Sequence, residues 1–170
     1  YHEQEAPLQH ELRDEFSEAI AWNNLGYAYM SLGDLSKAEE SVNKSLSLHR
    51  IGGRQENVGV ELDTLAMIYR QQGKWEQAIE HCQHALAIFR EINNAHHISV
   101  ALGVLGSIYS DLGDYSRALD HSIQTLEVAR SANDHLQVMT GLTDMANRYF
   151  YLLEYEKAEM FFTQAVDLAR

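Results

Sequence analysis

Tyrosine recurs at a fixed interval along this chain, and that interval constrains the fold more than any other feature. The series has a step of 40 positions and comprises Tyr29, Tyr69, Tyr109 and Tyr149. Alanine keeps the same step at Ala38, Ala78, Ala118 and Ala158. A period of this length predicts an array of similar units, each of which buries its apolar side only against its neighbours.

The residues around Tyr29 predict two helices joined by a short turn. Before the turn, apolar and small residues follow the i, i+3, i+4, i+7 spacing of one helix face: Trp22, Leu25, Gly26, Tyr29 and Leu32. Gly33 suits the left-handed position that ends a helix, and Asp34 can cap the next helix. The second helix presents Leu35, Ala38, Val42, Leu46 and Leu48 to the core. Two helices with so short a connection form an antiparallel hairpin.

The hairpin pattern returns three more times. Similar turns follow at Gly73-Lys74 and Gly113-Asp114, whereas Leu153 takes the glycine position in the fourth copy. The position of Gly26 holds only glycine or alanine, at Ala66, Gly106 and Ala146. A small residue there allows the two helices of a hairpin to approach closely.

The motifs resemble the tetratricopeptide repeat, in which W-x-x-L-G-x-x-Y precedes A-x-x-x-F. The first copy carries Trp22, Leu25, Gly26, Tyr29 and Ala38, but departs from the pattern at Val42, Ser45 and Arg50. The usual period of the family is 34 residues, so the longer period here should lengthen both helices by about a turn. Long repeats of this kind look like those of kinesin light chains, polarity-complex adaptors, and bacterial regulators that sense peptides or carry ATPase domains.

The resemblance implies an all-α fold, a right-handed superhelical solenoid of four helical hairpins. We expect the hairpins at about residues 16–52, 53–92, 93–132 and 133–170. Residues 1–15 should form an irregular or partial preceding element, with a helix that begins near Pro7 because proline is tolerated in a first helical turn. The chain starts at Tyr1 and stops where a unit ends, so we expect a single array excised from a longer protein.

The charge balance limits the partners. The formal charge is −12, from 25 acidic against 13 basic residues, which argues against nucleic acid and against anionic membranes. No apolar run reaches the roughly 18 residues of a membrane span, and no signal peptide is visible. Cys82 is the only cysteine, which excludes an intrachain disulfide and fits a reducing compartment. We expect a cytoplasmic protein.

The sequence indicates neither catalysis nor a metal site. His81 and His84 are spaced to share a metal, but a zinc site needs three or four ligands and nothing fixes a third. Cys82 takes the position of Val42, Ser122 and Phe162, which we expect to face the hairpin core, whereas a nucleophile needs exposure and an activating base. We therefore expect no enzyme, no cofactor and no bound metal.

A stripe beside the core face of each first helix is the candidate binding surface, called here the first-helix stripe. In a superhelix it lines the concave side, and its amide, guanidinium and aromatic groups are types that recognise peptides. Its members are Asn23, Asn24, Tyr27, Met30, Asp63, Met67, Arg70, Ser107, Asn147, Phe150 and Tyr151. Family members that grip a C-terminal carboxylate carry several basic residues here, and this stripe offers Arg70 with little else. A solvated face without a ligand is the alternative interpretation.

The fourth copy concentrates aromatic residues: Tyr149, Phe150, Tyr151, Tyr155, Phe161 and Phe162. They either pack against a further unit or form a hot spot for a partner. The sequence as a whole predicts a protein- or peptide-binding scaffold or sensor module of a larger signalling protein. The alternative is self-association, including a homodimer, through stacked end faces.

Overall fold

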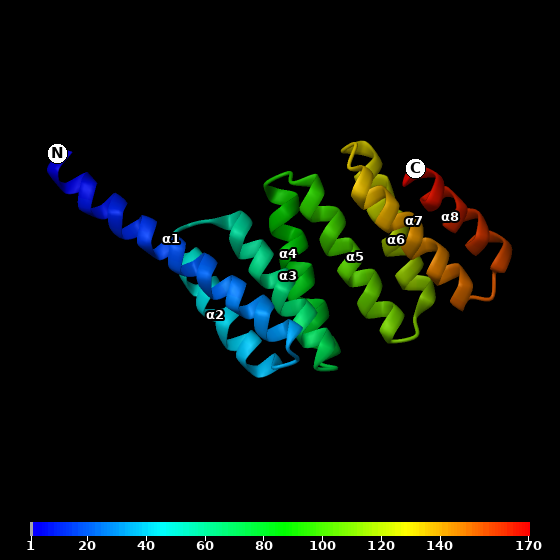
Figure 1. Ribbon diagram of the computed structural model, residues 1–170, viewed down its shortest axis with the longest axis horizontal. Coiled ribbons are helices and arrows are strands. Elements are labelled where there is room, and N and C mark those ends of the chain that lie inside the picture. The colour runs from blue at the N-terminus through cyan, green and yellow to red at the C-terminus, as the bar shows by residue number, and fades with distance from the viewer. Residues whose placement is uncertain (1) are drawn as a thin grey trace. The chain divides into compact units, whose positions relative to one another are not determined.

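The computed structural model describes residues 2–170, with side chains from Asp14 onward, and every regular element in this part of the chain is an α-helix (Figure 1). In chain order they are α1 (His2–Ser31), α2 (Leu35–Ile51), α3 (Gln55–Gln71), α4 (Trp75–Glu91), α5 (Ala95–Asp111), α6 (Tyr115–Ser131), α7 (His135–Tyr151) and α8 (Tyr155–Leu168). The expected all-α array of helical hairpins is confirmed. Helices α2 to α7 each have 17 residues.

All the turns between these helices share one backbone geometry, whether they lie inside a hairpin or between two hairpins. Each contains one residue with a left-handed φ: Gly33 (79°), Gly53 (66°), Gly73 (72°), Asn93 (54°), Gly113 (76°), Asn133 (55°) and Leu153 (63°). The amide after the left-handed residue bonds back into the helix, as from Asp34 N–H to the Tyr29 carbonyl at 3.0 Å. This 6→1 bond is the Schellman ending of a helix. Structurally, therefore, the 40-residue period is built from two equivalent steps of helix and turn.

Side chains cap the helices that follow several of these turns. Asp34 accepts from the Lys37 amide at 3.2 Å, and Asp114 accepts from the Arg117 amide at 2.9 Å. Asn94 and Asp134 make the same contact with His97 and Gln137. The predicted Gly–Asp stop and start signals are thus confirmed at Gly33-Asp34 and Gly113-Asp114.

The chain divides into two compact units, residues 1–88 and 89–170, with the division inside α4. In the first unit α2 packs against both α1 and α3. Val42 and Leu65 are fully buried there. A Cβ added to Gly26 would lie 2.5 Å from Val42 Cγ2, which confirms that α1 and α2 approach closely at this glycine.

In the second unit α6 packs against both α5 and α7, and α7 packs against α8. Its core contains Leu126, Leu142, Met145 and Ala165, with Leu119, Ile123, Val138, Met139, Tyr149 and Phe161 partly buried around them. Gly106 repeats the close approach of Gly26, because a Cβ there would lie 3.3 Å from the Ala118 carbonyl oxygen.

The repeated tyrosines occupy equivalent stacks. Rings on the second helix contact three of them: His81 on Tyr69 at 5.0 Å, His121 on Tyr109 at 5.4 Å, and Phe161 on Tyr149 at 5.5 Å between centroids. A cation lies over each tyrosine, at 4.4–5.4 Å from the centroid: Lys37, Lys74, Arg117 and Lys157. Cation–π attraction and ring packing both favour tyrosine at this position.

Two expectations need correction. Helix α1 begins at His2 instead of near Pro7, because an internal proline deletes one backbone bond while the rest of the ladder continues. Phe162 was expected in a hairpin core, but 38% of it is exposed. Its counterparts Val42 and Ser122 are buried on α2 and α6, each of which also packs against the first helix of the next hairpin. No described helix packs on α8 in that way.

Candidate functional site

Two members of the first-helix stripe on α1 form hydrogen bonds with residues of α3. The Tyr27 hydroxyl and Thr64 Oγ1 are 3.0 Å apart, and Asn23 Nδ2 donates to Glu61 Oε2 at 2.6 Å. These two hydrogen bonds fasten α1 to α3 side by side. The α1 part of the stripe is therefore held in a fixed position relative to its α3 part.

The stripe in the first unit mixes exposed and half-buried groups. Asn24 is exposed, and Tyr27 exposes 37% of its surface. Met30, Met67 and Arg70 are half-buried. A side chain that anchors a partner must be accessible to it and also held in position by its neighbours.

Asp63 lies under the stripe instead of on it. It is 6% exposed, and Cys82 Sγ donates to its Oδ1 at 3.5 Å. Burial disfavours the carboxylate and raises the pKa of Asp63 to about 6, against the smaller opposing effect of the Cys82 hydrogen bond.

The remaining stripe members belong to the second unit. Ser107 on α5 and Asn147 on α7 are half-buried. Phe150 and Tyr151, at the end of α7, expose 52% and 55% of their surface. Tyr151 stacks on Tyr115 with 4.9 Å between centroids, and Phe150 contacts the Tyr155 ring edge-on at 5.6 Å.

A buried polar cluster joins α1, α2 and α3 beneath the stripe. Glu61 accepts from Ser45 Oγ at 2.7 Å and from Asn23, and His49 Nε2 lies 3.6 Å from its Oε1. Both Glu61 and His49 are 1% exposed. Burial raises the pKa of Glu61 and lowers the pKa of His49, so both groups are driven toward their neutral forms.

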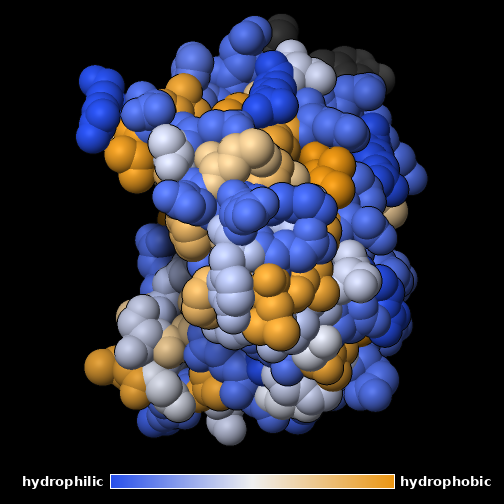
Figure 2. All heavy atoms as spheres, turned by 90° about the vertical axis from the view of Figure 1, so that its right-hand side faces the viewer, coloured by the Kyte–Doolittle hydropathy of each residue, from blue (hydrophilic) through white to orange (hydrophobic). Residues whose placement is uncertain are grey.

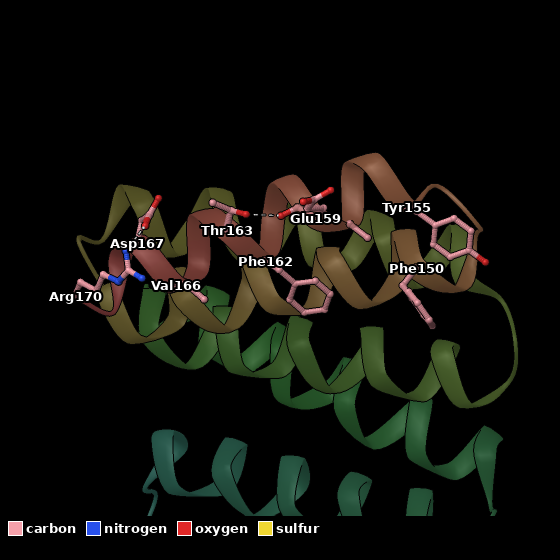
Figure 3. Close-up of a pocket in the computed structure, with 9 residues that line it drawn as sticks. Phe150, Tyr155, Glu159, Phe162, Thr163, Val166, Asp167 and Arg170 are labelled. Atoms are coloured by element: carbon pink, nitrogen blue, oxygen red, sulfur yellow. Dashed lines mark hydrogen bonds and ion pairs between the residues drawn. The ribbon is translucent and has the colours of Figure 1, made fainter.

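A groove of about 610 Å³ lies on the last hairpin, between α7 and α8, and is called here the end groove (Figure 3). Phe150, Phe162 and Val166 form its apolar side, while the α8 residues Glu159, Thr163 and Asp167 form its polar edge. Figure 2 shows apolar surface among hydrophilic groups on the face of the molecule that carries α8. The aromatic residues of the fourth copy thus divide, because Phe161 packs in the core and Phe162 lines the groove.

Comparison with known sequences identifies the family. The tetratricopeptide repeat sequence profiles match residues 19–50, 59–131 and 102–170, which together cover most of the chain. The chain belongs to the tetratricopeptide repeat family. The search of curated proteins found no match.

Solved structures share the fold of this tetratricopeptide array. BtubC from P. vanneervenii is 22% identical with a TM-score of 0.77, covering 89% of this chain and 63% of its own. A signal transduction ATPase with numerous domains and a tetratricopeptide repeat sensor, from Pyrococcus horikoshii, is 21% identical with a TM-score of 0.78, covering 91% and 24%. Aspartyl phosphate phosphatase F from Bacillus subtilis is 12% identical with a TM-score of 0.85, covering 91% and 41%. This chain therefore spans less than two thirds of each of these three proteins.

Sequence reasoning did not anticipate the buried cluster of the tetratricopeptide array. The signal was present in the repeat register, because the position of Glu61 holds Ala21, Ala101 and Gly141 in the other copies. The carboxylate of Glu61 at this position indicates that the junction between the first and second hairpins differs from the other junctions.

Two further observations concern the described part of this tetratricopeptide chain. No group of three or more histidine, cysteine, aspartate or glutamate side chains is arranged to hold a metal ion. None of the helices in this part of the chain combines the length and apolarity that a membrane span needs.

Proposed function

We propose that this tetratricopeptide array binds a segment of another protein along the first-helix stripe, as the scaffold or sensor part of a larger protein. The observation that carries the proposal is the restrained exposure of Tyr27. Its ring is accessible, while its hydroxyl is tied to Thr64 on the neighbouring helix. A pre-positioned aromatic group loses little conformational freedom on binding and so retains more of its contact energy.

The neighbours of Tyr27 suit an extended or helical peptide segment. Asn24 offers an amide that can both donate to and accept from a peptide backbone. Met30 and Met67 are adaptable apolar groups that pack against varied side chains. Arg70 supplies a planar cation for a carboxylate or an aromatic ring.

The net negative charge of the chain indicates the charge of the partner segment. With a formal charge of −12, long-range attraction favours a segment that carries basic residues. Association should then weaken as salt is added, because salt screens these charges. The comparisons fit a binding role: the Pyrococcus horikoshii protein uses its tetratricopeptide repeats as a sensor.

The test begins with partner capture from cell extract and mapping of the bound segment on a peptide array. Affinity for that peptide is then measured for two double variants. Asn24→Ala with Arg70→Ala alters the stripe, whereas Glu80→Ala with His84→Ala alters exposed groups on α4. His81 is unsuitable as a control because its ring contacts Tyr69. We expect at least tenfold weaker binding in the stripe variant alone; weakening in the α4 variant alone would move the site off the stripe.

Self-association is a second candidate function, and the end groove favours it. Phe162 and Val166 expose apolar surface that their counterparts elsewhere in the array bury. Exposed apolar surface of this kind marks interaction sites. Light scattering over a range of concentrations tests this candidate, which fails if the protein stays monomeric at millimolar concentration.

A further inference from the structure

The end groove lies where the repeat register provides a seat for a helix. In the first unit α3 packs against α2, and the α2 residues Val42 and Leu46 are 0% and 4% exposed. The residues 120 positions later are Phe162 and Val166, and they are 38% and 52% exposed. Within the part of the chain that the structure describes, the surface that α2 covers with α3 is open on α8.

A polar contact of the α2–α3 interface has its counterpart in the end groove as well. Glu39 on α2 accepts from the Tyr69 hydroxyl at 3.0 Å and from Gln72 Nε2 at 3.1 Å. Glu159 holds the corresponding position on α8 and lines the end groove. The groove therefore retains a carboxylate acceptor beside its apolar surface, which suits a helix that carries a tyrosine.

Helix α1 has the matching face. The α3 residues on the seating side are Leu62, Leu65 and Tyr69, and all are at most 6% exposed. Their counterparts 40 positions earlier on α1 are Trp22, Leu25 and Tyr29. Leu25 is 37% exposed, and Trp22 and Tyr29 are half-buried. The chain thus carries both halves of the α2–α3 interface a second time, one on α8 and one on α1.

We propose that the end groove binds α1 of a second copy of this chain, in the register in which α3 packs on α2. The Tyr29 hydroxyl of the second copy then donates to Glu159, as Tyr69 does to Glu39. Leu25 packs against Phe162, and Trp22 packs against Val166. The proposal rests on self-association, the second candidate function, and names the two surfaces that carry it.

The same register brings unlike charges together. A Cβ on Gly141 would lie 3.4 Å from Leu126 Cα, which aligns α7 with α6. By the repeat step, Ala21 of the incoming helix aligns with Val166. Because successive helices run antiparallel, Glu18 then falls close to Arg170. Complementary charges of this kind fix the orientation of two partners more than they add affinity.

The two surfaces differ, so the contact is head-to-tail. Such an interface leaves one free face at each end of a dimer, and it continues into larger rings or open chains. An isologous contact between two end grooves would instead stop at a dimer. The size distribution therefore separates the two geometries.

The experiment blocks each face separately and then mixes the products. Phe162→Asp places a charge in the end groove, and Leu25→Asp places one on the α1 face. Val166→Asp and Ala21→Asp are second variants of the same two surfaces at more exposed sites. Circular dichroism checks that each variant folds. We expect the parent to show a mass that rises beyond the dimer with concentration. Each single variant should be monomeric, and a 1:1 mixture of the two should form a dimer and no larger species.

Leu136→Asp is the matched control, because it adds the same charge to an exposed position of α7 that does not line the end groove. It should assemble like the parent, and so should Arg70→Ala on the first-helix stripe. A parent that stays monomeric at millimolar concentration overturns self-association as a whole. Association that survives Leu25→Asp and Ala21→Asp, or a mixture that stays monomeric, overturns the head-to-tail contact and leaves self-association standing.

A double-mutant comparison tests the register itself. Tyr29→Phe and Glu159→Gln each remove one partner of the proposed hydrogen bond while keeping side-chain shape. We expect each to weaken association three- to tenfold, and the two together to weaken it no further than the stronger single change. Fully multiplicative effects would show that the two side chains do not meet, and would overturn this register.

Discussion

Leu153 is the residue at which this chain departs most clearly from its own turn rule. Its φ is 63° at a turn position that carries glycine in the other three within-hairpin turns, and 70% of its surface is exposed. The left-handed conformation costs a residue with a Cβ about 1–2 kcal/mol. Its exposed side chain recovers little of this cost through packing.

Leu153→Gly should therefore stabilise the protein by about 1 kcal/mol, after the larger backbone entropy of glycine is subtracted. The measurement is the midpoint of urea denaturation. Leu152→Gly is the matched control, because Leu152 has a φ of −80° and gains nothing from glycine. If Leu153→Gly shows no higher midpoint than the parent, the left-handed strain at this turn is refuted.

Asp63 predicts a pH dependence of stability. Its pKa in the folded protein is about 6, above the ordinary value of 3.8. Between these two values the folded state holds more protons than the unfolded state, so the stability contributed by Asp63 falls as pH rises from about 4 to about 6. The loss amounts to at most about 3 kcal/mol above this range.

Asp63→Asn should remove that dependence. The difference in unfolding free energy between the variant and the parent should move in favour of the variant from pH 4 to pH 6 and then remain level. The comparison cancels the opposite contribution of His49, whose lowered pKa makes the folded state less stable as pH falls below about 6.5. A difference that stays constant across this range would place the Asp63 carboxylate in solvent.

At the scale of the element, α5 contains a glycine that packing requires and one that it does not. A Cβ at Gly106 meets the Ala118 carbonyl at 3.3 Å, whereas a Cβ at Gly103 meets nothing within 4 Å. Gly106→Leu should destabilise the protein by about 1–3 kcal/mol because it forces α5 and α6 apart. Gly103→Leu should be neutral or stabilising by up to about 1 kcal/mol, because leucine favours a helix more than glycine does.

Thermal and urea unfolding of these two variants measure the difference directly. The pair is informative because both changes add the same side chain to the same helix, so helix propensity cancels. Equal unfolding midpoints would contradict the close approach of α5 and α6 at Gly106.

The helices and turns were largely predictable from the sequence, since each depends on local chemistry. Gly33 and Asp34 signal the end of one helix and the start of the next through their own backbone preferences and hydrogen bonds. Phe162 was misjudged because its burial depends on whether a further helix covers α8, and no local pattern reports this. The repeat register aligns Phe162 with Val42, but it does not reveal whether a further helix packs on α8.

The buried cluster could not be predicted for the opposite reason. Glu61 and Asp63 stand in a segment whose acidic residues look solvated in sequence. Glu61 is buried because Asn23 and Ser45, 38 and 16 positions away, supply its hydrogen bonds. The first-helix stripe stays a prediction throughout, although the structure ties its Tyr27 to Thr64 and places its Asp63 beneath the surface.

At the scale of the whole molecule, the net charge separates the two association modes. Copies that each carry a formal charge of −12 repel one another, and added salt screens that repulsion. Self-assembly through the end groove should therefore strengthen between about 0.05 M and about 0.5 M salt. Binding of a basic partner segment to the first-helix stripe should weaken over the same range.

Sedimentation of the chain alone and titration with the partner peptide, both over this salt range, provide the two measurements. If the assembly dissociates in high salt, specific charge pairs such as Glu18 with Arg170 contribute more to association than the apolar contact does. A partner affinity that salt leaves unchanged would remove the expectation of a basic partner segment.

The polar cluster around Glu61 determines which hairpin can follow the first one. The turns do not determine this, because they all share one backbone geometry. Every described turn between helices has the same backbone form, so a hairpin could be excised or duplicated without disturbing a single helix end. Excising residues 53–92 would place Ala101 where Glu61 now stands. The Asn23 amide would then lose its carboxylate acceptor, while the Ser45 hydroxyl would keep only its bond to the Ala19 carbonyl. Each lost hydrogen bond should cost about 0.5–1.5 kcal/mol. The first hairpin is thus matched to the second by the hydrogen bonds that Glu61 accepts. Recombination that removes or duplicates a hairpin should therefore reduce stability more at this junction than at the others.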